Sequence, residues 1–126
     1  MFELSETPKF DDLDGIELSL NEYQKLAMRT CNLKCAGDKL HHAIFGLTSE
    51  AGEVAGLFQK QYQGHAIDLI RTKKELGDAL WFIAEACDAM GTTLNEVAVM
   101  NIEKLRKRYP EGFEADRSLN RAEGDV

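Results

Sequence analysis

Residues 75–91, ELGDALWFIAEACDAMG, carry the clearest helical pattern in the chain. The large apolar residues of this stretch recur in alternating steps of four and three, at Leu76, Leu80, Ile83, Cys87 and Met90. Because an α-helix has 3.6 residues per turn, this spacing places them on one helix face. Gly91 supplies a helix stop. The stretch therefore predicts a helix ending near residue 91, in which we expect Trp81 to pack in the core, with stacking on a base as the alternative.

Two more helices are predicted on the N-terminal side of this stretch. Ser19 and Glu22 have the form of a capping box, which predicts a helix over about 20–31. Gly37 is expected to break the chain, and Asp38 to cap a second helix that reaches about residue 63. Apolar residues in steps of four and three line one face of that helix, at Leu40, Ile44, Leu47, Ala51, Val54 and Phe58.

A fourth helix is predicted on the C-terminal side, from a capping box at 93–96 to Tyr109 and Pro110. We find no strand pattern of useful length. The predicted fold class is all-α, a helical bundle of about four main helices that is completed by oligomerisation. Within this chain of 126 residues we expect an acidic N-terminal arm at 1–18, one helical domain at 19–112 and a C-terminal tail at 113–126.

Charge and composition exclude several classes of function. The net charge is −7, and residues 1–22 hold seven acidic residues and one basic residue, so the rest of the chain is nearly neutral. Such a body lacks the basic face that a nucleic acid polymer requires. The longest apolar run, 79–84, is far too short to cross a membrane. Three cysteines and an acidic start without a signal peptide lead us to expect a cytoplasmic protein with free thiols.

Two pairs of acidic residues carry the candidate chemistry. Glu50 and Glu53 lie three residues apart on the second helix, and Glu75 and Asp78 lie three apart on the third. Residues at this spacing are neighbours on a helix surface. If the two helices pack side by side, the four carboxylates can converge, and such a cluster is repulsive unless cations fill it. Hard cations such as Mg²⁺ prefer these oxygen ligands. The alternative is a set of solvated surface acids.

These motifs resemble a known family. Residues 47–54, LTSEAGEV, are followed by residues 75–81, ELGDALW. The combination resembles the MazG-like nucleotide pyrophosphohydrolases of the all-α NTP pyrophosphatase superfamily, whose motif is Glu-x-x-Glu, a variable spacer and Glu-x-x-Asp. The segment 21–24 looks like the family's first helix, and residues 101–113 look like its last helix and exit. The predicted domain at 19–112 is then MazG-like.

The resemblance implies Mg²⁺-dependent hydrolysis of a ribo- or deoxyribonucleoside triphosphate to the monophosphate and pyrophosphate, with Mn²⁺ as a substitute, in nucleotide-pool house-cleaning. It makes Glu50, Glu53, Glu75 and Asp78 metal ligands, with a glutamate of the first pair, Glu50 or Glu53, as catalytic base. It assigns Lys104 to phosphate oxygens, Asn101 to the sugar or base, and Arg108 to a further phosphate contact. Ser49 stands where many members have a glutamate, so the resemblance leaves the number of metal ions open.

Three alternatives compete with this interpretation. A phosphoribosyl-ATP pyrophosphohydrolase or a dUTP- or dCTP-specific pyrophosphatase of the same superfamily would use the same chemistry on another substrate. A non-enzymatic helical dimerisation module would carry its acids as surface decoration. A di-iron bundle requires Glu-x-x-His pairs, and this sequence has none.

The third predicted helix also bears on assembly. Besides its main stripe it carries apolar residues on other faces, among them Trp81, Phe82, Ala84 and Ala86. A helix that is apolar on most sides is either central in its domain or shared with a second chain. We therefore expect a homodimer or homotetramer, and the resemblance implies the same.

Overall fold

A computed structural model describes residues 15–126 of the chain. The described residues are all-α with four main helices, which confirms the predicted all-α class. Within the described range the one β feature is an isolated bridge between Pro110 and Gly112. Most of the predicted acidic arm, residues 1–14, lies outside the described residues. No helix within 15–126 combines the length and the hydropathy that a bilayer crossing requires.

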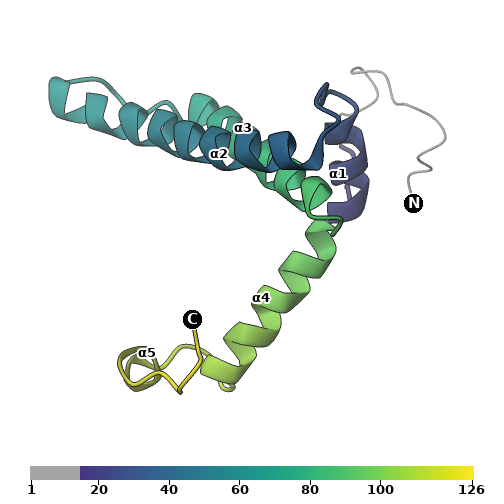
Figure 1. The fold of residues 1–126 in the computed structure, drawn as a ribbon. Helices are drawn as coiled ribbons and strands as arrows, with labels where there is room; N and C mark the ends of the chain where they lie inside the picture. Colours follow the sequence, from purple (N-terminus) through teal and green to yellow (C-terminus); the bar gives the residue numbers. More distant parts are fainter. Residues whose placement is uncertain (1–14) are drawn as a thin grey trace. The chain divides into compact units, whose positions relative to one another are not determined.

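The chain divides after Leu94 into two compact units. In the first, α2 (Ala36–Gln59) and α3 (Leu69–Ala89) lie side by side and antiparallel, and α1 (Leu20–Met28) packs against α3 (Figure 1). A short 3₁₀ turn, η2 (Lys60–Gln63), follows α2. Gly64 then takes a left-handed conformation with φ of 91°, which only glycine adopts without strain, and the chain reverses.

Contacts between α2 and α3 fix how the two helices are aligned. Successive contacts are about one helical turn apart on each helix and run in opposite directions along the chain. They are Lys39 Nζ with Asp88 Oδ2 at 2.6 Å, His42 Nδ1 with Glu85 Oε1 at 2.6 Å, and the backbone of Gly46 against the ring of Phe82. This alignment brings the middle of α2 opposite the first half of α3.

The core of the first unit lies where α1 meets α3. The buried residues there are Ala27, Ala84, Cys87 and Leu94. Trp81 packs against them, and its Nε1 donates to the Ala27 carbonyl at 3.1 Å and to Thr30 Oγ1 at 2.8 Å. The expected core role of Trp81 is therefore confirmed. Its indole N–H has protein partners, as a buried tryptophan requires.

The helix starts follow the sequence only in part. The capping box of Ser19 and Glu22 is present, so that prediction is confirmed. The expected break at Gly37 and cap at Asp38 are wrong, because α2 begins at Ala36 after the N-cap residue Cys35. Asp38 instead lies in the first turn, where its negative charge is favourable against the helix dipole. The start of α3 is capped by Asp68, whose carboxylate accepts from the Arg71 N–H at 2.9 Å.

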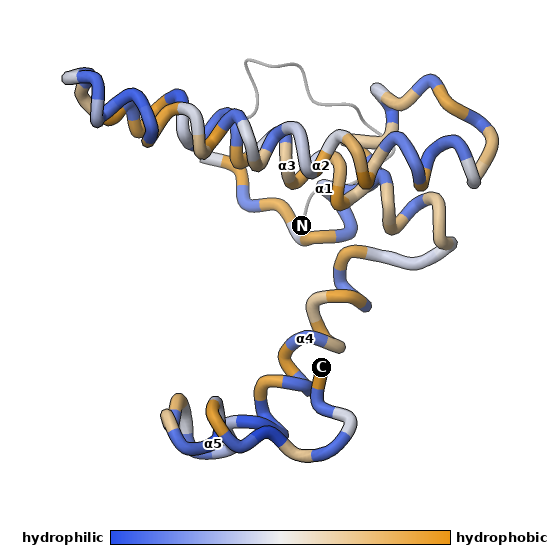
Figure 2. Tube along the Cα trace, turned by 60° about the vertical axis from the view of Figure 1, so that its left-hand side comes forward, coloured by the Kyte–Doolittle hydropathy of each residue, from blue (hydrophilic) through white to orange (hydrophobic). Residues whose placement is uncertain are grey.

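The paired helices leave much apolar surface uncovered. Apolar segments recur along the length of both α2 and α3 (Figure 2). Phe45 is 74% exposed, Ile70 is 70% exposed and Leu76 is 54% exposed. The apolar stripes predicted for the second and third helices are thus only partly buried within one chain.

The second unit, Asn95–Val126, contains most of α4 (Leu94–Arg108) and the short α5 (Ala115–Leu119). Arg108 holds the C-terminal segment through two hydrogen bonds to Asp125, from Nε to Oδ2 at 2.7 Å and from Nη2 to Oδ1 at 2.6 Å. The sequence predicted the end of α4 but not α5, whose five residues are too few to show a helical period.

Candidate active site

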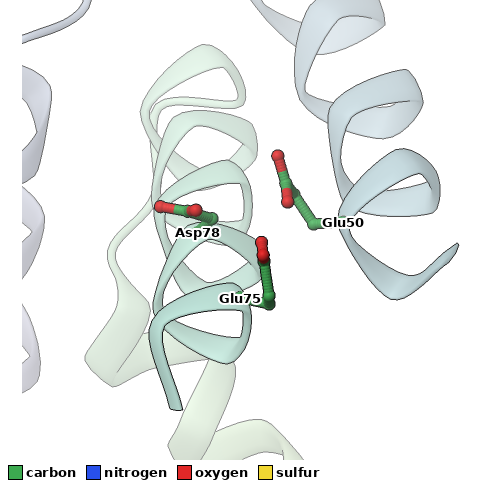
Figure 3. A group of neighbouring side chains, drawn as sticks. All are labelled: Glu50, Glu75 and Asp78. Carbon is green, nitrogen blue, oxygen red and sulfur yellow. The ribbon is translucent and has the colours of Figure 1, made fainter. Parts of the chain in front are cut away.

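Three of the four predicted metal ligands meet across the first unit. Glu50 lies on α2, and Glu75 and Asp78 lie on the facing side of α3 (Figure 3). One carboxylate oxygen from each lies within 4.8 Å of those of the other two. Glu50 and Glu75 are half-buried, whereas Asp78 is exposed. The cluster is therefore open to solvent on one side and bounded by two helices on the other.

The spacing along the helices explains this convergence. Glu75 and Asp78 are one turn apart, so both side chains project from the same side of α3. The antiparallel alignment then brings Glu50 opposite this turn. Nothing in the sequence spacing of 25 residues between Glu50 and Glu75 requires such a meeting. It follows from the packing of α2 on α3.

Glu53 is the fourth predicted ligand, and the structure does not include it in the group of three. It lies one turn after Glu50 on α2, and it is exposed. Its charge nevertheless acts on Glu50, because it is among the carboxylates that raise the pKa of that residue. Glu53 thus lies beside the cluster, with its carboxylate open to water.

The electrostatics of the cluster disfavour three free anions. Partial burial, followed by the nearby charges of Asp78, Glu75 and Glu53, raises the pKa of Glu50. One cation is close by, since Arg71 Nε lies 3.5 Å from Glu75 Oε1 one turn earlier on α3. This pair is weak, because the Arg71 side chain is half-exposed and the two atoms are 3.5 Å apart. The carboxylates of the cluster still repel one another, and a bound divalent cation would remove this repulsion.

The donor set fits a hard divalent cation. All three groups offer carboxylate oxygens, which Mg²⁺ prefers, and oxygens around one such ion are typically up to about 4 Å apart. The observed separations, within 4.8 Å, need little adjustment to reach that arrangement. The exposed side leaves room for water or a phosphate oxygen to complete the coordination. Glu50, Glu75 and Asp78 can therefore hold the ion that the sequence predicts.

The three predicted substrate-binding residues lie in the second unit, on α4. Lys104 and Arg108 line a cavity of about 550 Å³ together with Lys107 and the C-terminal segment. Arg108 is engaged by Asp125, as described above. Asn101 and Lys104 are exposed.

The sequence patterns did not link His42 with Glu85 in the first unit. Glu85 is fully buried, and His42 Nδ1 lies 2.6 Å from its Oε1. The spacing of His42 gives no signal for this contact, because a histidine near a helix start has no distinctive pattern. The one available signal was Glu85 itself, an acid inside the apolar run of α3 that had to find a partner.

Comparisons with known proteins identify the family. The family model described as the MazG nucleotide pyrophosphohydrolase domain matches residues 39–113, which is more than half of the chain. The chain therefore belongs to this family, as the motifs predicted. It is also similar to the Gene 37 protein of Mycobacterium phage L5, with 29% identity over an alignment that covers 71% of this chain and 88% of that protein. No solved structure gives a significant match.

Proposed function

We propose that the protein is a divalent-cation-dependent nucleoside triphosphate pyrophosphohydrolase, which converts a ribo- or deoxyribonucleoside triphosphate to the monophosphate and pyrophosphate. The observation that carries the proposal is the convergence of Glu50, Glu75 and Asp78 from two facing helices, inside the region that matches the family. A role in removing unwanted nucleotides is part of the same proposal.

The acid cluster would hold Mg²⁺, or Mn²⁺ in its place, through Glu50, Glu75 and Asp78. Such an ion neutralises triphosphate charge and makes a bound water easier to deprotonate. The protein places three oxygen donors on α2 and α3, and contacts further along these two helices keep them aligned. Substrate phosphates can approach from the exposed side of the cluster.

Glu53 is our candidate for the general base, with Glu50 as the other catalytic glutamate. A water oxygen forms a bond to the α-phosphorus, and the bond between that phosphorus and the oxygen bridging to the β-phosphate breaks. Pyrophosphate leaves, and Glu53 accepts the proton of the water. Two features support this role: the position one turn from Glu50, and an exposed carboxylate outside the group of three.

For the second unit we propose that Lys104 and Arg108 contact phosphate oxygens and that Asn101 contacts the sugar or base. The bidentate pair between Arg108 and Asp125 supports the choice of Arg108, since the same planar fork matches two oxygens of a phosphate. Arg108 would have to release Asp125 to bind substrate in this way. The domain at 19–112 remains our prediction for the functional unit.

We also propose that the active form is a homodimer or homotetramer. Large apolar side chains on α2 and α3 are exposed in the single chain, including Phe45, Ile70 and Leu76. Burying the exposed part of each such side chain is worth roughly 1–2 kcal/mol. A second copy that packs on this surface would complete the bundle that the sequence predicts.

A pyrophosphate-release assay tests the function. The panel contains canonical and modified ribo- and deoxyribonucleoside triphosphates, including dUTP and dCTP, and phosphoribosyl-ATP, each with and without Mg²⁺. We expect pyrophosphate and a monophosphate from at least one nucleotide, only with the cation. ³¹P NMR of the products identifies the bond that breaks. Release of inorganic phosphate and a diphosphate would contradict the proposed reaction, and no turnover of any nucleotide would reject the proposed function.

A further inference from the structure

The pair of His42 and Glu85, which helps to align α2 with α3, also joins a buried carboxylate to a half-exposed imidazole. Glu85 is 0% exposed, whereas the His42 side chain is 50% exposed. The second carboxylate oxygen of Glu85 lies 3.6 Å from the Cys31 thiol. Burying a carboxylate is costly unless hydrogen bonds compensate it, and an apolar residue at 85 would avoid the cost. The pair therefore connects a buried anion to a ring that reaches solvent.

The contacts of His42 fix the direction of its ring. The Nδ1–H donates to Glu85 Oε1 at 2.6 Å. The ring also packs edge-on against Phe82, with centroids 5.4 Å apart, and against Trp81 at 6.3 Å. Trp81 is itself anchored to α1. A carboxylate bound to one nitrogen of an imidazole sets the tautomer and the orientation of the other nitrogen. The Nε2 edge of His42 is thus presented in a fixed direction, where it can form a hydrogen bond with a ligand.

The pair lies on the same helix–helix seam as the acid cluster. His42 precedes Glu50 by eight residues, which is about 12 Å along the axis of α2. It precedes Glu53 by eleven residues, close to three full turns, so both side chains leave α2 on the same side. On α3, Glu85 follows Asp78 by seven residues, about two turns. A nucleotide whose phosphates lie at the acid cluster is long enough to bring its nucleoside to His42.

We propose that His42 is a substrate-binding residue that contacts the nucleoside, and that Glu85 is the positioning residue that holds it. The inference rests on the proposed function and adds a nucleoside contact in the first unit to the one proposed for Asn101. The Nε2 of His42 accepts a hydrogen bond from the nucleoside. The Phe82 ring, which packs against the backbone of Gly46, separates this contact from the cation cluster.

The first test compares His42→Ala with the control His41→Ala, which removes the neighbouring exposed histidine. For the best nucleotide of the panel, we expect His42→Ala to raise KM about tenfold and to leave kcat within about twofold of wild type. This is the effect expected from the loss of one hydrogen bond to the bound substrate. Inhibition by inorganic tripolyphosphate with Mg²⁺ should not change, because that ligand has no nucleoside. His41→Ala should change neither value. An unchanged KM in His42→Ala, or equal weakening of nucleotide and tripolyphosphate, would overturn the inference.

The second test separates positioning by Glu85 from a structural role. Glu85→Gln retains an oxygen that accepts from Nδ1–H, so we expect a KM close to wild type. Glu85→Leu fills the same space without an acceptor and should raise KM as His42→Ala does. ¹⁵N NMR of the His42 ring supplies a readout besides activity: protonation at Nδ1 in wild type and Glu85→Gln, lost in Glu85→Leu. If Glu85→Leu does not fold, the Glu85→Gln spectrum alone decides, and a ring protonated at Nε2 would reject the role of Glu85.

Binding of an α,β-imido nucleoside triphosphate, measured by calorimetry, separates this inference from the proposed function. If wild type turns over no nucleotide but binds the analogue about tenfold more tightly than His42→Ala, the function is rejected and the nucleoside contact stands. If wild type turns over nucleotides and His42→Ala binds the analogue equally well, the function stands and the contact is rejected. If wild type does not bind the analogue at all, both are rejected.

Discussion

Gly46 of α2 lies against the ring of Phe82 of α3, so closely that a Cβ at position 46 would overlap the ring atoms. The contact falls midway along the α2–α3 pair, between the His42–Glu85 pair and the acid cluster. Larger residues at 46 would push the helices apart at this point. The separation of Glu50 from Glu75 and Asp78 therefore depends on a glycine that has no chemical role of its own.

Gly46→Ala should lower the free energy of unfolding by about 1–2 kcal/mol, because overpacking outweighs the better helix propensity of alanine. The matched control is Gly56→Ala on the same helix, where a Cβ would meet nothing within 4 Å. That change should raise stability by about 0.5–1 kcal/mol. Urea unfolding midpoints measure both. A stabilising effect of Gly46→Ala would show that Phe82 moves aside freely.

Asp78→Asn should abolish turnover and also the thermal stabilisation by Mg²⁺, since it removes an oxygen anion from the group of three. For wild type, Mg²⁺ at a concentration of one hundred times its Kd should raise the free energy of unfolding by about 2.7 kcal/mol. Without the cation, Asp78→Asn should be as stable as wild type or more so, because it relieves repulsion. Glu17→Gln, which removes an exposed acid elsewhere, is the control. Wild-type rates in Asp78→Asn would remove this residue from the site.

Glu53→Gln should abolish turnover while most of the Mg²⁺ stabilisation remains, because Glu53 lies outside the group of three. Differential scanning fluorimetry with and without Mg²⁺, beside the pyrophosphate assay, distinguishes a base from a ligand. Loss of both signals would make Glu53 a fourth ligand.

Lys104→Ala should raise KM and lower turnover more than Lys107→Ala does. Both lysines line the cavity of the second unit, but only Lys104 occupies the position that the family resemblance assigns to phosphate. Lys107 projects about 60° away from Lys104 around α4. Steady-state kinetics on the same nucleotide measures the difference. Equal, small effects would indicate that the basic side of α4 is only solvated surface.

Acid should release the C-terminal segment from Arg108. The hydrogen bonds from Arg108 lower the pKa of Asp125 below its ordinary value of 3.8. A lowered carboxyl pKa contributes stability that is present above the ordinary value and is lost as the pH falls through the folded-state pKa. Carboxyl ¹³C NMR should show Asp125 titrating at lower pH in wild type than in Arg108→Gln. Equal midpoints in the two proteins would show that the pair does not persist in solution.

Local sequence patterns were enough to predict the all-α class and the family. Four-three spacing in residues 75–91 and the capping box at Ser19 identified helices without any tertiary information, because both signals are local. The Glu-x-x-Glu and Glu-x-x-Asp motifs identified the family, and the match over residues 39–113 confirmed it. The start of α2 was mispredicted because Gly37 and Asp38 are tolerated in a first turn as well as at a break.

Which of the acidic side chains meet could not be predicted without the packing of α2 on α3. All four carboxylates follow equivalent helical spacings, yet Glu53 falls outside the group formed by Glu50, Glu75 and Asp78. Which residues face one another depends on how α2 is aligned along α3. That alignment is set by contacts across 40 or more residues of sequence, such as Lys39 with Asp88 and His42 with Glu85. Helical periodicity specifies one face of each helix, whereas the pairing of two faces depends on the side chains that fill the space between them.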